Sequence, residues 1–595
     1  MADETLARMF WNRVAEGRER PAQMIKEGGH WQTLPWSRVG EIVRELALGF
    51  LAFDRRPGER VALLSRSRAE WVQADFAILS TGCLTVPIYP SYTPRQIAHI
   101  VNDSEARTLI VEDVAQLAKA LEVRDRMPGL SEIIVITGGE VHAPPVLTWT
   151  ELRRRGRARA DALNPLLAGR VASTASEDIA TIVYTSGTTG EPKGVAQTHA
   201  NHMAMLSALA QVPGVEPGDV HLLFLPLAHA FARLEAFVGV HRGLVTAFAE
   251  SLDRVAENLR EVRPHFIFGV PRVFEKAHEK VLADVAVSPV KRRVFAWAMD
   301  IGRRVSGIEQ AHSSLPHRLD IQRRVAHRLV FSKIHAALGG RLRFAVSGGA
   351  PLGRELAEFF HAAGILIVEG YGLTETCPAL TWNRIDRFKF GSVGQALPGV
   401  ELRIANDGEI LARGPNIATR GYWKKPAATA EGFDTDHWFH TGDIGRVDED
   451  GFVYITDRKK DLIVTSGGIN IAPQRVETLL RRDPLISQAM AFGDRRPFPV
   501  VLLTLNQREL VRLAQAEGIL VTDLVRLGTH PKVTEQIERI LEEANAELPS
   551  YARVKKFAVL PLELTEEAGE LTATQKVKRK IVAEKYHRLL ESLYA

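Results

Sequence analysis

Short apolar runs alternate with amphipathic stretches in the first third of the chain. Short apolar runs predict buried strands, and β-branched residues favour them because their side chains fit the pleated surface of a sheet. These runs lie at 60–64, 108–111 and 133–136. One intervening helix is predicted to begin at Thr93 and Pro94, since threonine caps a helix and proline suits its first turn. The alternation predicts parallel α/β layers.

Four later apolar runs each lead into a turn that contains glycine. They span 179–194, 265–273, 341–352 and 365–376. Each is predicted to be a buried strand that ends in a tight turn. Residues 198–210 and the segment 274–338 are predicted to be helical. The N-terminal dipole of the 198–210 helix is predicted to favour bound phosphate. The segment 138–177, which contains two adjacent prolines and an arginine run, is predicted to be a connection.

One amphipathic helix is predicted near the C-terminus, at 533–547. Its apolar face is formed by Val533, Ile537, Ile540, Leu541 and Ala544. The pattern is too short to continue as a coiled coil, so it indicates a helix of a small domain. A chain of 595 residues also exceeds what one hydrophobic core usually supports, and two or more domains are therefore expected.

Composition places the chain among ordinary globular proteins, with 45% apolar and 25% charged residues. Cys83 and Cys377 are too few for a disulfide framework or a structural zinc site, which indicates a reducing compartment. The N-terminal residues include acids and no long apolar core, and no stretch approaches the roughly 18 uninterrupted apolar residues of a membrane span. A cytoplasmic protein is expected.

The net charge of +5 is mild, but basic residues gather at 153–159 and 276–343. A solvated helix face is the favoured interpretation. Attraction to anionic lipid headgroups, with peripheral contact at the inner membrane face, and attraction to the phosphates of a nucleotide-bearing cosubstrate are the alternatives. No helix-turn-helix, zinc finger or aromatic platform accompanies the charge, so a nucleic-acid partner is not expected.

The stretch 185–194 reads TSGTTGEPKG and follows a predicted buried strand. Its glycines permit sharp turns and close approach to a ligand, its hydroxyl groups can donate hydrogen bonds, and Lys193 adds a positive charge. The nucleoside-triphosphatase loop GxxxxGK[ST] does not fit, because Pro192 replaces its second glycine and Gly194 replaces its hydroxyl residue. The stretch is predicted to be a phosphate loop of another kind.

This loop, together with YGLTE at 371–375 and TGD at 441–443, resembles the signatures of the adenylate-forming acyl-CoA synthetase superfamily. The resemblance covers nearly the whole chain, and the basic helical segment is similar to an insertion of bacterial long-chain fatty-acid–CoA ligases. It implies an α/β fold with a large N-terminal domain of layered mixed sheets and helices, and a small mobile α+β C-terminal domain. The N-terminal domain is also expected to contain a smaller β layer with strands at 408–410 and 414–423. The expected boundaries are 1–457, a hinge at 458–460 and 461–595.

The resemblance implies that the enzyme uses ATP and Mg²⁺ to activate a fatty acid and then transfers the acyl group to CoA. The expected nucleotide contacts are Thr185, Ser186, Gly187, Thr188, Thr189, Gly190, Lys193, Gly348, Gly349, Ala350, Pro351, Tyr371, Gly372, Asp443 and Arg458. The expected acyl contacts are His229, Phe231, Gly269 and Val270. A lone histidine beside apolar residues is as readily a core group, so His229 rests on the resemblance.

The matched catalytic residues are Lys576, Thr374 and Glu375. Glu375 and Thr188 are the expected Mg²⁺ ligands, since hard oxygen donors suit this ion. Lys460 matches the hinge position, and Gly467 and Gly468 match the face that a rotated C-terminal domain presents to CoA.

Several alternatives remain open at this point. Ile469 stands where bacterial long-chain relatives carry lysine, so a ligase that loads an acyl carrier protein is an alternative to a CoA ligase. An aryl or sterol carboxylate is an alternative substrate, and a binding relative without catalysis is an alternative class. Either a monomer or a homodimer is compatible with the sequence.

Overall fold

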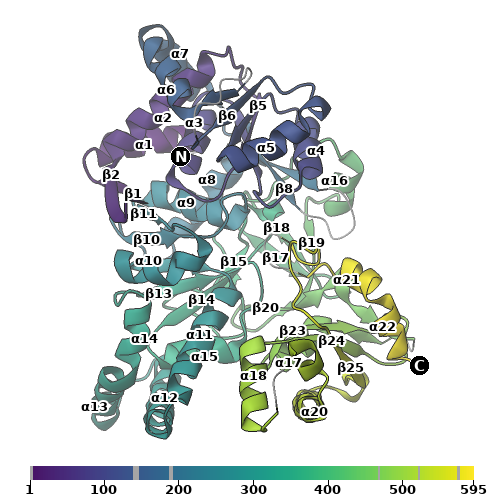
Figure 1. Ribbon diagram of the computed structural model, residues 1–595. Coiled ribbons are helices and arrows are strands. Elements are labelled where there is room, and N and C mark those ends of the chain that lie inside the picture. The colour runs from purple at the N-terminus through teal and green to yellow at the C-terminus, as the bar shows by residue number, and fades with distance from the viewer. Residues whose placement is uncertain (1–3, 139–145, 186–191, 467–468, 520–522, 573–576) are drawn as a thin grey trace.

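The computed structural model describes residues 4–138, 146–185, 192–466, 469–519, 523–572 and 577–595. Two large sheets and their helices form the N-terminal part of the molecule, and the C-terminal part lies beside them (Figure 1). Among these residues, no helix is both long enough and apolar enough to cross a membrane.

The first large sheet has seven strands. Its order is β7 (Val146–Thr148), β6 (Glu132–Val135), β5 (Thr108–Val111), β3 (Arg60–Leu64), β4 (Leu84–Ile88), β8 (Ile179–Thr185) and β9 (Lys193–Thr198). All neighbouring strands are parallel except β8 and β9, which form an antiparallel pair. The strands predicted at 60–64 and 108–111 are therefore confirmed, and the expected phosphate loop connects two strands at one edge of this sheet.

The second large sheet has nine strands. Its order is β16 (Gln395–Ala396), β15 (Thr381–Trp382), β14 (Leu366–Tyr371), β13 (Phe344–Ser347), β12 (Phe266–Gly269), β10 (Val220–Leu223), β11 (Val245–Phe248), β1 (Pro21–Glu27) and β2 (His30–Pro35). The central strands are parallel and apolar, as expected for a sheet covered on both faces. The turns that follow β12, β13 and β14 are those predicted from the apolar runs.

Helices cover both sheets. In the N-terminal half they are α1 (Leu6–Gly17), α2 (Trp36–Leu51), α3 (Ala69–Ser80), α4 (Pro94–Ser104), α5 (Val114–Glu122), α6 (Trp149–Ala158), α7 (Ala160–Ser173), α8 (His199–Ala210), α9 (Ala230–Arg242) and α10 (Val255–Val262). Helix α4 begins as predicted, with Thr93 as a capping-box residue and Pro94 in the first turn.

Two sequence predictions are wrong in this half. The segment 138–177 is not a simple connection, because its described residues form β7, α6 and α7, and Arg153 and Arg157 bind Glu45 of α2. The N-terminus of α8 was expected to favour bound phosphate. However, β9 places five extended residue steps between Lys193 and Thr198, about 17 Å, so the helix begins at the far end of that strand.

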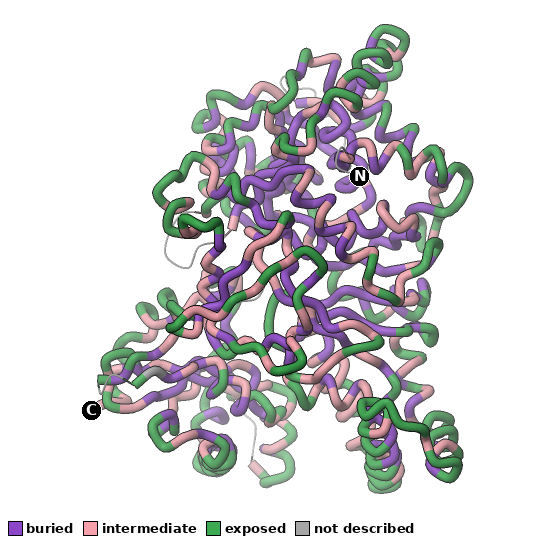
Figure 2. The backbone as a smooth tube through the Cα atoms, turned by 180° about the vertical axis from the view of Figure 1, so that it is seen from behind, coloured by how far each residue is buried: buried purple, intermediate pink, exposed green. Residues whose placement is uncertain are grey.

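A helical arm follows β12 and projects from the lower edge of the body in Figure 1. It contains α11 (Pro271–Ala286), α12 (Pro289–Gln310), α13 (His317–Ala326), the π-helix η3 (His327–Phe331) and α14 (Ser332–Ala337). The helical prediction for 274–338 is thus confirmed. Figure 2 shows the ends of the arm as largely exposed. Helix α15 (Arg354–Ala362) packs against α12.

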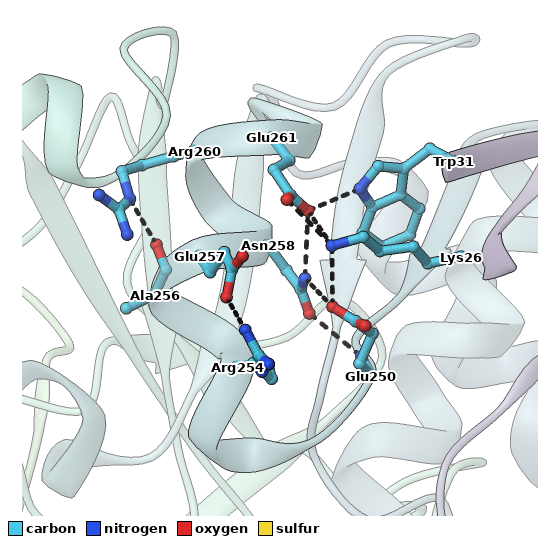
Figure 3. Close-up of polar contacts among 9 residues, drawn as sticks. All are labelled: Lys26, Trp31, Glu250, Arg254, Ala256, Glu257, Asn258, Arg260 and Glu261. Carbon is cyan, nitrogen blue, oxygen red and sulfur yellow. Dashed lines mark hydrogen bonds and ion pairs between the residues drawn. The ribbon is translucent and has the colours of Figure 1, made fainter. Parts of the chain in front are cut away.

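A polar network fastens α10 to the β1–β2 hairpin (Figure 3). The Lys26 ammonium donates to carboxylate oxygens of Glu250 at 3.0 Å and Glu261 at 2.9 Å. The Trp31 indole N–H donates to Glu261 at 2.8 Å, and the Asn258 amide donates to Glu250 at 2.8 Å. Because α10 also lines the cavity described below, these contacts fix one wall of it.

A four-stranded antiparallel sheet joins the body to the C-terminal part. It contains β17 (Glu401–Ile404), β18 (Glu409–Arg413), β19 (Phe439–Val447) and β20 (Val453–Arg458). The prediction of strands at 414–423 is wrong, because those residues form turns with one bridge between Val195 and Tyr422. Helix α16 (Pro426–Gly432) lies against β19.

The C-terminal elements build their own apolar cores. The strands are β21 (Ile463–Val464), β22 (Asn470–Ile471), β23 (Ile486–Phe492), β24 (Val500–Leu505) and β25 (Lys556–Val559), and the helices are α17 (Pro473–Leu480), α18 (Gln507–Ala516), α19 (Leu524–Gly528), α20 (Pro531–Ala546), α21 (Arg579–Lys585) and α22 (His587–Ser592). Two core clusters are drawn entirely from residues after 462. The predicted apolar face of the 533–547 helix is buried in one of them.

Candidate active site

A cavity of about 2250 Å³ lies where the two large sheets, the four-stranded sheet and the C-terminal part meet. Its wall includes Thr185 and Lys193, which end β8 and begin β9 on the two sides of the predicted phosphate loop. The turns after β13 and β14, the N-terminus of α9 and the helices α10, α11 and α12 also line it. The carboxyl ends of parallel strands commonly form ligand sites in α/β folds, and the cavity occupies such a position.

Asp443 on β19 connects two of the predicted nucleotide residues. The buried Tyr371 hydroxyl donates to Asp443 Oδ2 at 2.7 Å, and Arg458 Nε lies 2.9 Å from Asp443 Oδ1. Asp443 and Arg458 are directly opposite in the β19–β20 pairing, which explains their ion pair. Burial and the neighbouring carboxylate raise the pKa of Tyr371, so its hydroxyl remains a donor at neutral pH. All three residues line the cavity.

Thr374 and Glu375 belong to the short helix η4 (Thr374–Thr376), which begins after a two-residue turn that follows β14. The Tyr422 hydroxyl donates to Glu375 Oε1 at 2.7 Å, and the Gln197 amide donates to the backbone oxygen of Thr374 at 2.6 Å. Burial raises the pKa of Tyr422, which keeps its hydroxyl protonated at neutral pH. Lys193 Nζ lies 5.4 Å from the centroid of the Tyr422 ring.

The turn at Gly348, Gly349, Ala350 and Pro351 lines the cavity as a unit. Gly349 has φ of 80°, a conformation that favours glycine, and a Cβ on Gly348 would lie 3.0 Å from the Phe231 ring. Glu369 Oε1 accepts the Leu352 backbone N–H at 3.1 Å, which ties the turn to β14. Burial raises the pKa of Glu369 to about 8, so this carboxyl is mainly neutral at pH 7.

Gly372 packs closely against the backbone of Pro378. A Cβ at this position would lie 2.0 Å from the carbonyl oxygen of Pro378. Any larger residue would therefore push the two segments apart, so glycine allows the turn after β14 to pack against Pro378.

Three of the four predicted acyl-contact residues line the cavity: His229, Phe231 and Val270. His229 caps α9, where its Nδ1 accepts the Phe231 backbone N–H at 3.2 Å. The Phe231 ring lies 5.4 Å from the Phe268 ring between centroids. Gly269 instead lies behind the wall, where an added Cβ would be 3.1 Å from Phe274.

C-terminal residues close one side of the cavity. Lys460 lies in η5 (Lys459–Asp461), and burial lowers its pKa. Arg482, just after α17, has its Nη2 2.7 Å from Glu355 Oε1 at the start of α15 and thereby joins this segment to the body. Thr572, Val577, Lys578 and Arg579 also belong to the wall. In this arrangement the cavity is thus shared between the body and the C-terminal part.

Eight predicted site residues lie outside the described residues. They are Ser186, Gly187, Thr188, Thr189 and Gly190 of the phosphate loop, Gly467 and Gly468 of the expected CoA face, and Lys576. For these positions the sequence predictions stay predictions.

Tyr422 and Glu369 both line the cavity, although no sequence motif indicated them. Tyr422 follows a glycine in a turn-rich stretch, where periodicity carries no signal. Glu369 lies within an apolar strand. A carboxylate in such a run indicates a specific partner or role, because an acidic residue is almost never fully buried without a partner. Tyr89 and Tyr92, after β4, also line the cavity and were not predicted.

Two family models match the chain. Residues 10–423 match the AMP-binding enzyme model, and residues 460–595 match the AMP-binding enzyme C-terminal domain model. The long-chain-fatty-acid–CoA ligase FadD15 of Mycobacterium tuberculosis is 39% identical over 573 residues, with 95% of this chain and 93% of that protein covered. The long-chain-fatty-acid–CoA ligase ACSBG2 of Xenopus laevis is 32% identical over 625 residues, with 99% and 84% covered.

Solved structures share the fold over the whole chain. The anthranilate CoA ligase AuaEII in complex with anthranoyl-AMP gives a TM-score of 0.75 at 20% identity and covers 100% of this chain and 99% of its own. A fatty acyl CoA synthetase of Mycobacterium tuberculosis gives a TM-score of 0.61 at 21% identity, with 98% of both chains covered.

Proposed function

The chain belongs to the AMP-binding enzyme family, and we propose that it is a long-chain fatty-acid–CoA ligase. It would use ATP to convert a fatty acid into an acyl-adenylate and then transfer the acyl group to CoA, with AMP and pyrophosphate as the other products. The observation that carries the proposal is that one cavity contains both the polar residues expected around a nucleotide and a long series of apolar side chains. The similarity to named long-chain ligases agrees with this substrate class and does not favour a carrier-protein or aryl-acid ligase.

The apolar part of the cavity suits an acyl chain. Its side chains come from α10, α11, α12, η3 and α14 and include Leu259, Phe274, Val281, Phe295, Val330 and Ile334. A saturated hydrocarbon gains free energy mainly by leaving water, at about 0.8 kcal/mol for each buried CH₂ group. A long acid buries more CH₂ groups against this wall and should therefore bind more tightly than acetate.

The polar end of the cavity suits the nucleotide. In the first half-reaction, a carboxylate oxygen of the fatty acid bonds to the α-phosphorus of ATP, and the bond to the β-phosphate oxygen breaks to release pyrophosphate. Asp443 and Arg458 would hold the ribose, and Lys193 would attract the phosphates. Tyr371 would border the adenine with its ring while its hydroxyl fixes Asp443. Positive charge near the phosphates offsets charge that develops in the transition state.

Glu375 is the described residue that we propose as a ligand for Mg²⁺. No group of three or more His, Cys, Asp or Glu side chains that could hold a metal ion is found within the described ranges. Mg²⁺ is commonly bound by one or two carboxylates together with substrate phosphates, and one carboxylate in the cavity wall fits that mode. When bound there, the ion would neutralise charge on the phosphates of ATP.

We propose that residues 461–595 act as a separate domain that rotates about Lys460 between the two half-reactions. Its separate core clusters support this division. In the second half-reaction the CoA sulfur bonds to the acyl carbon, and the bond from that carbon to the AMP oxygen breaks. The rotation would withdraw Lys576 and bring Gly467 and Gly468 to the site.

A product survey tests the proposed function. The enzyme is incubated with Mg-ATP and single carboxylates from acetate to stearate, plus cinnamate, each with and without CoA. We expect AMP and acyl-CoA to be greatest with acids of about 12 to 18 carbons, because the apolar wall is long. Mass spectrometry identifies the products. Accumulation of acyl-AMP without thioester would contradict a CoA ligase, and Ile469→Lys would then be the first variant to test for restored CoA transfer.

We further propose that α13 and η3 contact anionic lipid. Ile321, Val325 and Leu329 recur at helical spacing and are between 43% and 52% exposed. Arg318, Arg324 and Arg328 surround this stripe and are exposed. A basic amphipathic surface binds anionic membranes through partial burial of its apolar face and attraction to headgroups. This surface is part of the same arm that supplies the apolar cavity wall.

The double variant Ile321→Ser, Val325→Ser is expected to weaken binding to phosphatidylglycerol vesicles about tenfold at low salt, because two apolar anchors are lost. Co-sedimentation with the vesicles measures binding. The matched control is Leu121→Ser, Val525→Ser, which removes two side chains that are each 45% exposed elsewhere on the molecule. Failure of the unaltered protein to bind these vesicles at low salt would refute the lipid contact.

A further inference from the structure

Tyr422 lies between two segments of the nucleotide site that come from different parts of the chain. Its hydroxyl donates to Glu375 Oε1 at 2.7 Å, and its ring faces Lys193 Nζ at 5.4 Å from the centroid. Glu375 follows β14 of the nine-stranded sheet, and Lys193 begins β9 of the seven-stranded sheet. One side chain therefore contacts both the candidate metal ligand and the lysine of the phosphate loop.

The backbone around Tyr422 is held on two sides. Residue 422 forms a β-bridge with Val195, and the flanking residues make two hydrogen bonds to β9. These bonds run from Trp423 N to the Gly194 oxygen at 2.7 Å and from Ala196 N to the Gly421 oxygen at 3.0 Å. On the other side, the backbone N–H of Tyr422 donates to Thr429 Oγ1 at 2.9 Å. The position of the ring is thus set by the backbone.

The same stretch also holds the backbone of Glu375. Ala418 N donates to the Glu375 carbonyl oxygen at 2.8 Å. Glu375 is therefore fixed at its backbone by one residue of the stretch and at its carboxylate by another. A glutamate side chain is otherwise free to adopt many rotamers, and a fixed carboxylate lowers the cost of presenting it to a ligand.

We propose that Tyr422 is a positioning residue that orients the Glu375 carboxylate and the Lys193 ammonium before the nucleotide binds. This inference rests on the proposed use of ATP. The phenol would hold one Glu375 oxygen and so direct the carboxylate toward the cavity. The aromatic face would hold Lys193 only weakly, because a cation–π contact at a partly exposed site is weaker than a charge-assisted bond to phosphate. The ammonium carries three N–H donors, so Lys193 would bind a phosphate of ATP while it stays beside the ring.

If Tyr422 had only a structural role, that role would come from the packing of its ring. Tyr422 packs against a small buried cluster of Val195, Cys377 and Ala418. Phenylalanine would retain this packing and the contact with Lys193, whereas it would lose the hydrogen bond to Glu375. Leucine would lose both the hydrogen bond and the aromatic face. The two substitutions consequently separate packing, carboxylate orientation and lysine placement.

The test compares Tyr422→Phe and Tyr422→Leu with the matched control Tyr454→Phe. The Tyr454 hydroxyl also donates to a carboxylate, Asp448 Oδ2 at 3.2 Å, but neither residue lines the cavity. Calorimetry measures the affinity for ATP at a series of Mg²⁺ concentrations and the affinity for AMP without metal. Thermal unfolding reports structural damage.

For Tyr422→Phe we expect the Mg²⁺ concentration that half-saturates ATP binding to rise about tenfold, with unchanged AMP affinity and unfolding temperature, because a hydrogen bond to a charged group is lost. Tyr422→Leu is expected to weaken ATP binding further through Lys193. Tyr454→Phe is expected to change neither the Mg²⁺ dependence nor the ATP affinity. The same Mg²⁺ dependence in Tyr422→Phe and the unaltered protein would overturn the inference. So would a clear fall in both AMP affinity and unfolding temperature in Tyr422→Phe, since the hydroxyl would then stabilise the whole site and not orient Glu375 in particular.

These readouts distinguish the inference from the proposed function. Nucleotide binding is measured without any acyl substrate, so a wrong substrate class would alter the product survey and leave these titrations unchanged. The double variant Tyr422→Phe, Glu375→Gln provides a second check. If the phenol acts through Glu375, adding Tyr422→Phe to Glu375→Gln should cause less than a twofold further change, because the two substitutions disrupt one interaction.

Discussion

The variant Lys576→Ala is expected to form acyl-adenylate about 10²- to 10³-fold more slowly than the unaltered enzyme, while it transfers supplied acyl-AMP to CoA at nearly the same rate. The loss corresponds to one positive group that acts on developing transition-state charge. The two half-reactions differ because, in the proposed cycle, the C-terminal domain presents Lys576 only during adenylate formation. Rapid-quench measurement of pyrophosphate release and of thioester formation from synthetic acyl-AMP gives the two rates.

Lys580→Ala is the control for this prediction. Lys580 lies four residues further along the same basic segment and is exposed, whereas Thr572 and Val577, which flank the 573–576 stretch in the chain, line the cavity. If the segment were only a basic surface with no chemical role, the two variants would form acyl-adenylate at similar rates. Equal losses in both half-reactions of Lys576→Ala would contradict the division of labour between them.

Local sequence patterns predicted elements well where one physical signal was strong. The strands at 60–64 and 108–111 were indicated by short apolar runs, and the cap at Thr93 by a capping residue followed by proline. Both signals act over a few residues. The apolar spacing of α20 likewise identified the face that is buried. Such features depend on neighbours in sequence, so a single chain suffices to predict them.

Long-range pairing was beyond the reach of the sequence. Residues 193–198 form β9 because they pair with β8 and, through Gly194 and Ala196, with the stretch around Tyr422. The stretch around Tyr422 lies far from β9 in the chain, and no local pattern indicates that contact. The mistaken role for the α8 dipole has a nearer cause, since residues 193–198 form a strand that moves the helix away from the loop.

The candidate site shows the same contrast between motif and contact. Motifs identified Tyr371, Asp443 and Arg458 as separate positions, and the structure brings them into one hydrogen-bonded group. Tyr422 and Glu369 belong to no motif that carries chemistry by itself. Their contributions arise from what they contact, namely Glu375 and the backbone of Leu352. Contacts of this type become visible only after the chain is folded.

The variant Asp443→Ala is expected to lower kcat/KM for ATP by about 10²- to 10⁴-fold. In the proposed complex, Asp443 accepts hydrogen bonds from both ribose hydroxyls, and bonds to a charged acceptor contribute about 1.5–3 kcal/mol each. The substitution also removes the partner of the buried Tyr371 hydroxyl and of Arg458. Steady-state kinetics with varied ATP measures the loss, and thermal unfolding reports how much of it comes from the disturbed neighbours.

Deoxynucleotides separate ribose recognition from general damage around Asp443. The unaltered enzyme should bind 2′-deoxyATP and 3′-deoxyATP each about tenfold more weakly than ATP, because one bond to the carboxylate is lost in each case. Asp443→Ala lacks that acceptor, so it should bind all three nucleotides with nearly equal affinity. Persistent discrimination in the variant would mean that the ribose is recognised by other groups. Asp443 would then act by holding Tyr371 and Arg458 in place, and its loss would lower the affinity for every nucleotide by the same factor.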